Sequence, residues 1–413
     1  MMHNKVVITG MGTINPLGLS VEDSWENAIN GISGIGPITS FDTEEYNIKY
    51  ACEVKGFTPG NYLDIREARR RDRHQLFASA AAQEAINQSG LDINEEDPGR
   101  IGVIVSSAIG GLKAIADNMD ILRDKGPRRV SPFVVPMLMS NGAAGLISID
   151  NNFKGPSFSV ASACASGADG LGIAWSLIKT GVIDAAISGG SDAVVTEVAV
   201  AAFDRLGAVS RSNPEEKPTP RPFDISRDGF VIGEGAAIIV LERENRAIKR
   251  GANILAELAG YGSTADAFHI TAPSEDGVGG SKAIKIALGS AQINPDEVDY
   301  INAHGTATQL NDIAETKGIK SVFGDFAYNI PVSSTKSMTG HMMGTTAALE
   351  ALFCVKAIRE NVIPPTINLQ EPDPECDLDY VPIVAREKKI NTAVSNAFGF
   401  GGHNAVLVVK EYE

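Results

Sequence analysis

Short apolar runs recur along the chain without the polar alternation of a half-exposed strand. Nine runs rich in small and β-branched residues lie at residues 5–10, 100–107, 157–163, 184–190, 236–242, 298–305, 330–336, 391–402 and 404–412. Runs of this kind are typical of strands that are buried on both faces of a sheet. Helical patterns fall between several of them, so the sequence predicts an α/β protein with a mainly parallel sheet.

Two of the helical patterns are clear. Residues 20–31 begin with Ser20 and Asp23 at capping-box spacing, and residues 74–90 form an alanine-rich apolar pattern that ends at a glycine. Two longer segments, 156–181 and 330–358, share one layout of strand, small polar turn, glycine and apolar helix. This likeness predicts two related halves that divide near residue 255.

Length and charge narrow the classes of protein. A chain of 413 residues is too long for one simple core, which favours two domains or two fused halves. With 36 basic and 51 acidic residues, the net charge of −15 argues against nucleic acid as a partner. The N-terminal apolar run is too short for a signal peptide, and no stretch approaches membrane-spanning length, so we expect a cytoplasmic protein without stable membrane association.

The cysteines and histidines lack the spacing of metal ligands. The four cysteines (52, 164, 354 and 376) form no CxxC pair, and no HxxxH pattern is present, so we expect no disulfide framework and no metal site. Residues 6–18 resemble a dinucleotide-binding loop only in part, because Asn15 occupies the third glycine position of GxGxxG. We therefore reject a dinucleotide site.

Chemically useful side chains follow four of the predicted strands. These strands end at Cys164, His304, Lys336 and the loop 396–402, and His341 follows Lys336 by five residues at the predicted start of a helix. Ligands bind beyond the carboxyl ends of strands in open α/β sheets. The sequence thus predicts one site that holds a thiol, two imidazoles and an ammonium group.

Cys164 lies just after a predicted strand and just before a helix that runs to about Thr180, with Gly181 as its end. Free N–H groups at a helix start favour a thiolate, so we expect a lowered pKa and a nucleophile. The alternative is a buried structural cysteine, the role we assign to Cys52 and Cys354.

Other residues leave alternatives open. His304 and His341 suit a reaction that places negative charge on a carbonyl oxygen, because each neutral imidazole donates an N–H, although either fits a packing or capping role alone. Glu350 lies among apolar residues and either pairs with Lys336 or faces water. Phe400 in the glycine-rich loop 396–402 fits a gate over the thiol or an ordinary tight turn.

Five motifs in order give the chain a family resemblance. They are SACASG at 162–167, RPFDISRDGFVIGEGA at 221–236, NAHGTAT at 302–308, STKSMTGH at 334–341 and SNAFGFGGHN at 395–404. Together they resemble the elongating β-ketoacyl-[acyl carrier protein] synthases, most closely the type II form of bacterial fatty acid synthesis. The resemblance implies a thiolase-like five-layered αβαβα sandwich, present as a homodimer, with similar halves at residues 1–255 and 256–413. The first half carries Cys164 and the dimer and acyl-pocket segments, and the second carries His304, Lys336, His341 and Phe400.

The resemblance also implies a reaction, a decarboxylative Claisen condensation of malonyl-acyl carrier protein. Cys164 takes the acyl chain from acyl carrier protein as a thioester, and His304 and His341 assist malonyl decarboxylation and hold the enolate that lengthens the chain by two carbons. The backbone N–H groups of Cys164 and Phe400 form the oxyanion hole, and Lys336 and Glu350 form a supporting ion pair. No cofactor belongs to the protein, because phosphopantetheine arrives on the carrier.

Binding positions follow from the same resemblance. Thr306 and Thr308 match residues that contact the phosphopantetheine arm. Ile109, Phe203 and Phe398 match acyl-pocket and substrate positions, and Phe133 matches a pocket position that comes from the facing subunit. The basic clusters at 66–74 and 125–129 look like the surface that docks acyl carrier protein, with Arg69, Arg70, Arg128 and Arg129 as its cations.

Related enzyme classes fit less well. A degradative thiolase needs a second cysteine in the loop near 398–404, and initiating type III synthases have an asparagine at the position of His341. A stand-alone ketosynthase of a polyketide or specialised lipid pathway would carry the same motifs and stays open.

Overall fold

The computed structural model describes residues 5–413, and ten of its strands form one mixed sheet in the order β10-β9-β13-β14-β8-β1-β7-β6-β4-β5. The strands are β1 Val6–Ile14, β4 Ile101–Ser106, β5 Ser157–Phe158, β6 Ala185–Asp192, β7 Gly235–Arg243, β8 Ala256–Ala265, β9 Tyr300–Asn302, β10 Val332–Ser333, β13 Thr392–Gly399 and β14 His403–Lys410. The pairs at both ends of the sheet, β4 with β5 and β6 and β9 with β10 and β13, are parallel, and the pairs between them are antiparallel.

The two ends of this sheet repeat one topology. From the outer edge inward, the first group lies in the order β5, β4, β6, β7 and β1, and the second in the order β10, β9, β13, β14 and β8. In both groups these are the third, second, fourth, fifth and first strands along the chain. The innermost strands of the two groups, β1 and β8, pair antiparallel at only two positions, Val7 with Glu257 and Ile8 with Ala256. The two halves are therefore joined by their own hydrogen-bonded strands.

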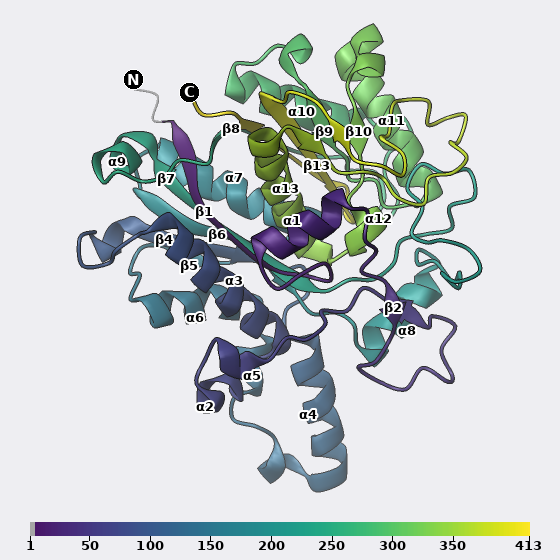
Figure 1. Cartoon of the computed structure of the whole chain (residues 1–413). Coiled ribbons are helices and arrows are strands. Elements are labelled where there is room, and N and C mark those ends of the chain that lie inside the picture. Colours follow the sequence, from purple (N-terminus) through teal and green to yellow (C-terminus); the bar gives the residue numbers. More distant parts are fainter. Residues whose placement is uncertain (1–4) are drawn as a thin grey trace.

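Helices complete a layered structure (Figure 1). Helices α3 (Arg73–Ser89) and α6 (Gly142–Asn151) pack on the outer face of the first group of strands, and α10 (Val278–Ala291) and α11 (Gln309–Phe323) cover the second. Between the groups lie α7 (Ser166–Lys179) and α13 (Thr346–Glu360), each of which contacts strands of both. The expected five-layered αβαβα fold class is confirmed.

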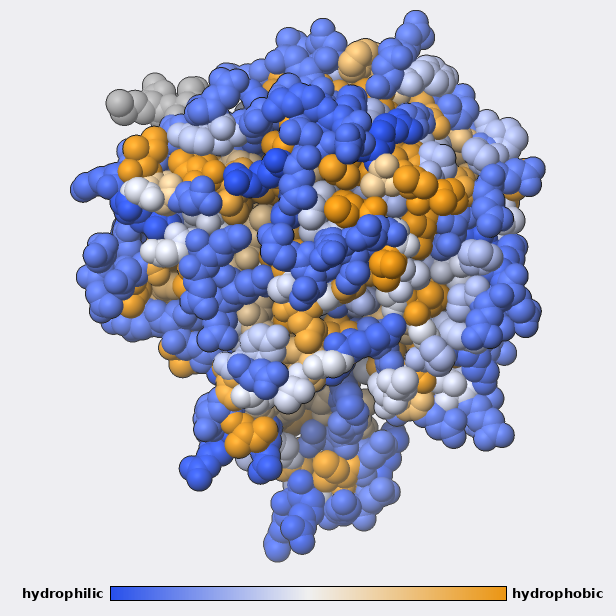
Figure 2. Space-filling model, in the orientation of Figure 1, coloured by the Kyte–Doolittle hydropathy of each residue, from blue (hydrophilic) through white to orange (hydrophobic). Residues whose placement is uncertain are grey.

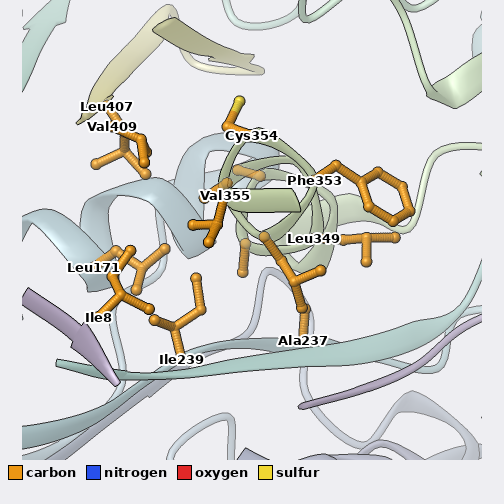
Figure 3. Close-up of a cluster of buried hydrophobic side chains, with 14 of the residues drawn as sticks. Ile8, Leu171, Ala237, Ile239, Leu349, Phe353, Cys354, Val355, Leu407 and Val409 are labelled. Carbon is orange, nitrogen blue, oxygen red and sulfur yellow. The ribbon is translucent and has the colours of Figure 1, made fainter. Parts of the chain in front are cut away.

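The middle layer forms the largest apolar core. Apart from its last two residues, α13 is buried, and its Leu349 and Val355 pack with Leu171 of α7 and with strand residues such as Ile8 and Leu407 (Figure 3). A helix that is buried all round needs an apolar sequence on every face, which explains the sequence TAALEALFCV in this helix. Its single carboxylate, Glu350, is thereby placed deep in the protein.

The remaining elements are short or peripheral. The helices are α1 Val21–Ile29, α2 Ile65–Ala68, α4 Leu112–Lys125, α5 Val134–Leu138, α8 Glu197–Leu206, α9 Glu244–Lys249 and α12 Lys336–Thr339, and the strands are β2 Gly36–Pro37, β3 Tyr50–Ala51, β11 Val362–Ile363 and β12 Arg386–Glu387. Helices α2, α4 and α5 form an extension below the layers, and apolar patches are visible on it (Figures 1 and 2). No helix within residues 5–413 is both long enough and apolar enough to cross a membrane.

Two sequence expectations need correction. Strand β8 was not predicted, because AELAGYGSTA is interrupted by glycine, alanine and tyrosine and lacks a β-branched run. The helix expected to start near His341 starts at Thr346, after a single 3₁₀ turn at Met343–Thr345. The helix start predicted at Ser20 is confirmed, since the Ser20 side chain caps α1 by accepting the N–H of Asp23 at 3.2 Å.

Candidate active site

One pocket of about 910 Å³, counting its open mouth, brings together most of the residues that the sequence singled out. Its lining includes Ile109, Cys164, Phe203, His304, Thr306, Thr308, His341, Phe398 and Phe400. They come from both halves, mostly from segments that follow strands or precede helices, with Phe203 on α8 and Phe398 near the end of β13. Most of the wall is apolar, so groups that enter it lose water.

The turn that carries Cys164 is tightly held. Cys164 lies in the 3₁₀ turn Ala163–Ala165, directly before α7 and six residues after β5. Ala163 has φ of 51°, a left-handed conformation that costs a residue with a side chain about 1–3 kcal/mol. The Ser166 hydroxyl donates to the Ala163 carbonyl at 2.6 Å and helps to hold this conformation.

The ionisation of Cys164 differs from the sequence expectation. Burial raises the pKa of the Cys164 thiol to about 11, although the backbone N–H groups of Phe400 and of Cys164 itself and the charge of Lys336 favour the thiolate. The expected lowering is therefore wrong, because desolvation of the sulfur outweighs the donors at the helix start. The same contacts show that the two N–H groups converge on the sulfur.

His304 and His341 lie next to each other in the pocket lining, in edge-to-face contact. Their ring centroids are 5.6 Å apart and their planes lie at 85°. Burial and the charge of Lys336 hold the pKa of both histidines well below the usual value of 6.5, so both are neutral at pH 7. Neutral imidazoles each offer one N–H donor and one acceptor nitrogen.

The contacts of His341 favour one tautomer. Its Nδ1 lies 3.1 Å from the Thr346 hydroxyl, which also accepts the N–H of Met342 at 2.8 Å. In the tautomer in which this hydroxyl donates to Nδ1, the imidazole proton is on Nε2. Nε2 is buried and has no hydrogen-bond partner within residues 5–413. An unpaired buried donor in a pocket is costly unless a ligand pairs with it.

The backbone at His304 is held by a residue that sequence reasoning missed. Glu315 of α11 accepts the N–H groups of His304 and Gly305, both at 2.8 Å, and also accepts the Asn396 side-chain amide at 3.0 Å. Burial raises the pKa of Glu315. In the sequence, this carboxylate lies in a polar stretch that looks like a hydrated helix face, so only the tertiary contacts identify it.

Lys336 and Glu350 form a buried ion pair. The sequence had left two possibilities open for Glu350, this pair or a helix face in contact with water. Lys336 Nζ lies 2.5 Å from Glu350 Oε1, and both side chains are at most 2% exposed. Burial raises the pKa of Glu350 to about 7 against the opposing charge of Lys336. Neither residue lines the pocket, so the pair acts on the histidines through its charge rather than by contact.

The glycine-rich loop packs directly against the turn that carries Cys164. A Cβ atom at Gly399 would lie 2.9 Å from the Ser162 carbonyl oxygen and 3.0 Å from the Cys164 nitrogen, so only glycine permits this approach. The Phe398 ring lies 5.9 Å from the His304 ring, centroid to centroid. The loop thus covers the thiol and one histidine together.

The remaining pocket residues form a mouth and an apolar wall. The hydroxyl groups of Thr306 and Thr308 lie 2.9 Å apart, directly after His304 in the chain. On the apolar side, Phe203 packs edge-on against Phe230, which packs edge-on against His341. Phe230 was not singled out from the sequence, where it is one residue of the motif at 221–236.

Phe133 and the four arginines expected to dock acyl carrier protein are not part of this pocket's lining. Phe133 is 37% exposed on the extension and packs under the Arg70 guanidinium, 5.0 Å from its ring centroid. Arg69, Arg70, Arg128 and Arg129 are exposed. The cluster at 66–74 is smaller than the sequence indicates, because Arg71 pairs with Asp150 at 2.6 Å and Arg73 pairs with Glu234 at 2.6 Å.

The described residues hold no group of three or more His, Cys, Asp or Glu side chains that suits a metal ion. All four cysteines are free and buried.

Comparisons with known proteins agree along the chain. Residues 3–247 match the family described as Beta-ketoacyl synthase, N-terminal domain, and residues 255–370 match Beta-ketoacyl synthase, C-terminal domain. A 3-oxoacyl-[acyl-carrier-protein] synthase 2 of Staphylococcus aureus is 49% identical over 411 residues, which cover 100% of this chain and 99% of the relative. A protein of the same name from Synechocystis is 48% identical over 409 residues, 99% of this chain and 98% of the relative.

Solved structures agree in fold. A β-ketoacyl synthase from Burkholderia phymatum has a TM-score of 0.92 at 33% identity, covering 99% of this chain and 100% of that one. A ketosynthase structure with a type II polyketide acyl-carrier protein and a hexaketide has a TM-score of 0.92 at 34% identity, with full coverage of both chains.

Proposed function

Because this chain belongs to the β-ketoacyl synthase family, we propose that its pocket catalyses the elongation of an acyl chain by decarboxylative condensation, as a 3-oxoacyl-[acyl-carrier-protein] synthase of type 2. The supporting observation is the convergence of one thiol, two backbone N–H groups and two neutral imidazoles in one apolar pocket. The identity to the two relatives of that name, 49% and 48%, exceeds the 34% to the polyketide ketosynthase structure.

The first half-reaction is a thioester exchange. The Cys164 sulfur attacks the carbonyl carbon of the acyl thioester on acyl carrier protein, the bond to the carrier sulfur breaks, and the thiol proton ends on that sulfur. The N–H groups of Cys164 and Phe400 stabilise the oxyanion of the tetrahedral intermediate. The raised pKa of Cys164 makes this anion stabilisation important, since the thiolate itself is scarce at neutral pH.

The second half-reaction is the condensation. Malonyl-acyl carrier protein loses CO₂, and the electron pair of the broken carbon–carbon bond forms an enolate whose oxygen accepts hydrogen bonds from His304 and His341. The enolate carbon attacks the acyl thioester, and Cys164 leaves as the product forms. The position of His341 Nε2 supports this role, because it is buried at the pocket without a partner among the described residues and can donate to the enolate oxygen.

The other residues position the substrates. Burial together with the charge of Lys336, which Glu350 holds in place, keeps both histidines unprotonated. Thr306 and Thr308 bind the phosphopantetheine arm at the mouth. Ile109, Phe203 and Phe398 enclose the acyl chain. The protein needs no cofactor of its own for these steps.

A second copy of the chain completes the pocket wall in this proposal. Strand β5 is the end strand of the sheet and has one neighbour, and exposed apolar side chains lie near it on α5, α6 and the preceding loop. They are Phe133, Val135, Leu138, Met139 and Ile149. A homodimer formed through this face would cover these side chains and bring Phe133 of one copy toward the acyl pocket of the other. We place this dimer in the cytoplasm, where its four free thiols stay reduced.

The decisive experiment separates the two half-reactions. Purified protein is incubated with malonyl-acyl carrier protein and a series of acyl-acyl carrier proteins, and products are read by mass spectrometry. We expect a product two carbons longer from the wild type, no product but continued CO₂ release from Cys164→Ala, and an acylated Cys164 without product from His304→Ala with His341→Ala. Acyl transfer in Cys164→Ala, or no product from the wild type with any chain, would overturn the proposal.

A further inference from the structure

A buried carboxylate outside the reacting groups bridges two walls of the pocket. Asp192, the last residue of β6, is fully buried, and four donors surround it. Its Oδ1 accepts the Ser107 hydroxyl at 2.6 Å and the Ile109 N–H at 3.4 Å, and its Oδ2 accepts the Gly344 N–H at 2.8 Å and the Ala108 N–H at 3.2 Å. The site described above does not use this side chain.

The donors come from two separate segments of the chain. Ala108 and Ile109 belong to the loop after β4 and line the acyl side of the pocket. Gly344 belongs to the segment that carries His341 and Met343, which also line the pocket. A single oxygen, Oδ2, therefore joins the acyl wall to the histidine loop.

The junction is closely fitted. The Ser107 hydroxyl accepts the Gly110 N–H at 2.8 Å, so its own hydrogen is directed to Asp192. A Cβ atom at Gly344 would lie 2.8 Å from the Ala108 nitrogen and 2.9 Å from Asp192 Oδ2, so the two loops meet without space between them. Neither loop moves freely away from the carboxylate.

We propose that Asp192 is a positioning residue that couples acyl-chain selection at Ile109 to malonyl decarboxylation at His341. The proposal rests on the function given above. An acyl chain that reaches Ile109 displaces the acyl wall, and the longest of the four contacts, to the Ile109 N–H, yields first. The buried carboxylate then shifts with its remaining donors, because leaving a buried charge without partners is expensive. Gly344, and with it the His341 loop, follows.

The chain supplies matched variants for a test. Asp192→Asn keeps the size of the side chain but replaces one carboxylate oxygen, an acceptor, by an NH₂ group, which cannot accept from the donors on that side. Ser107→Ala removes one donor on the acyl side and leaves the Gly344 contact. Asp184→Asn makes the same chemical change directly before β6, where Asp184 pairs with Arg100, Arg243 and Arg246 far from the pocket contacts.

Two ratios are measured within each preparation, so the folded fraction cancels. The first is kcat/KM with palmitoyl-acyl carrier protein over octanoyl-acyl carrier protein, and the second is CO₂ release without an acyl donor over condensation with one. For Asp192→Asn we expect both ratios to change about fivefold or more, the lower end of coupling between linked sites. For Ser107→Ala we expect a change in the first ratio alone, and for Asp184→Asn no change in either.

The outcomes separate this inference from the proposed function. If the wild type condenses but Asp192→Asn lowers all rates in proportion, Asp192 is structural only and the coupling is refuted. The same holds if only one ratio changes in Asp192→Asn. If the wild type itself does not condense, the proposed function fails first.

Discussion

Burial raises the pKa of the Cys164 thiol and lowers the pKa of the His304 and His341 imidazoles, so it favours the uncharged form of all three groups. A neutral thiol suits a pocket that must exclude water before the acyl chain arrives. Neutral imidazoles suit an enolate that needs donors rather than a second cation. Lys336 adds to the effect at the histidines because its positive charge opposes their protonation.

The raised pKa of Cys164 leads to a direct prediction. The rate of alkylation of Cys164 by iodoacetamide should rise about tenfold per pH unit from about pH 7 to pH 9, since the reactive thiolate fraction grows with pH below the pKa. Mass spectrometry of the Cys164 peptide follows the reaction, with Cys164→Ala as the control for other thiols. A plateau below about pH 8.5 would show a lowered pKa instead.

His304 gives a second prediction, on stability. Its folded pKa is lowered, so below the unfolded value of about 6.5 the unfolded chain binds a proton that the folded chain does not. The stability that this group contributes is present above about pH 6.5 and is lost as the pH falls through the folded pKa. Relative to wild type, His304→Asn should therefore gain up to about 1.4 kcal/mol per pH unit between about pH 6.5 and pH 5.5.

Urea unfolding of both proteins across this pH range measures the difference. A constant difference would mean that His304 titrates alike in the folded and unfolded chains.

Close approach between elements depends on particular glycines. Helix α3 lies on β1 so closely that a Cβ atom at Gly12 would be 2.0 Å from the Ala81 carbonyl oxygen. The strand cannot move away, because β7 pairs with it on one side and β8 on the other. The many alanines of α3 permit the same close approach, because their side chains are small.

This packing predicts that Gly12→Ala destabilises the protein by about 1–3 kcal/mol or more, the usual cost of overpacking. Gly289→Ala in α10 is the matched control, since nothing lies within 4 Å of its Cβ position. There the added methyl should stabilise by about 0.5–1 kcal/mol through helix propensity. Chemical denaturation measures both, and equal effects of the two variants would contradict the packing argument.

At the scale of the whole molecule, charge has to be reconciled with the proposed partner. The chain carries a net charge of −15, yet Arg128 and Arg129 are exposed on the extension, and Arg70 lies against Phe133 of the same region. A local basic surface steers an acidic partner even when the total charge repels it, and this effect weakens with salt.

We therefore predict that reversing Arg128 and Arg129 to glutamate raises KM for acyl carrier protein by about tenfold while kcat falls less, because steering acts mainly on association. The exposed residues Lys282 and Lys285 of α10 provide the control, since their reversal changes the net charge equally on another face. Steady-state kinetics at low and moderate salt distinguish the two pairs. An unchanged KM would place docking elsewhere.

The sequence predicted most of the strands but only part of the candidate site. Nine strands were predicted from their apolar runs. Strand β8 was missed because it is rich in glycine and alanine, and these small residues are needed only because helices pack closely on the strand. Cys164 and His304 were singled out because each follows a predicted strand next to small residues, and His341 because it lies at a predicted helix start five residues after Lys336. Glu315, Thr346 and Asp192 were not, because their roles consist of contacts with loops distant in the chain.

The sequence by itself determined nine of the ten strands of the main sheet, the repeated layout of two segments and the motifs that carry Cys164, His304 and His341, since these depend on local patterns and fixed spacing. Only the tertiary structure decided the ionisation of those groups, the sequestration of Arg71 and Arg73, and the junction at Asp192. Burial and distance between segments control these properties, and both arise when residues from the two halves come together.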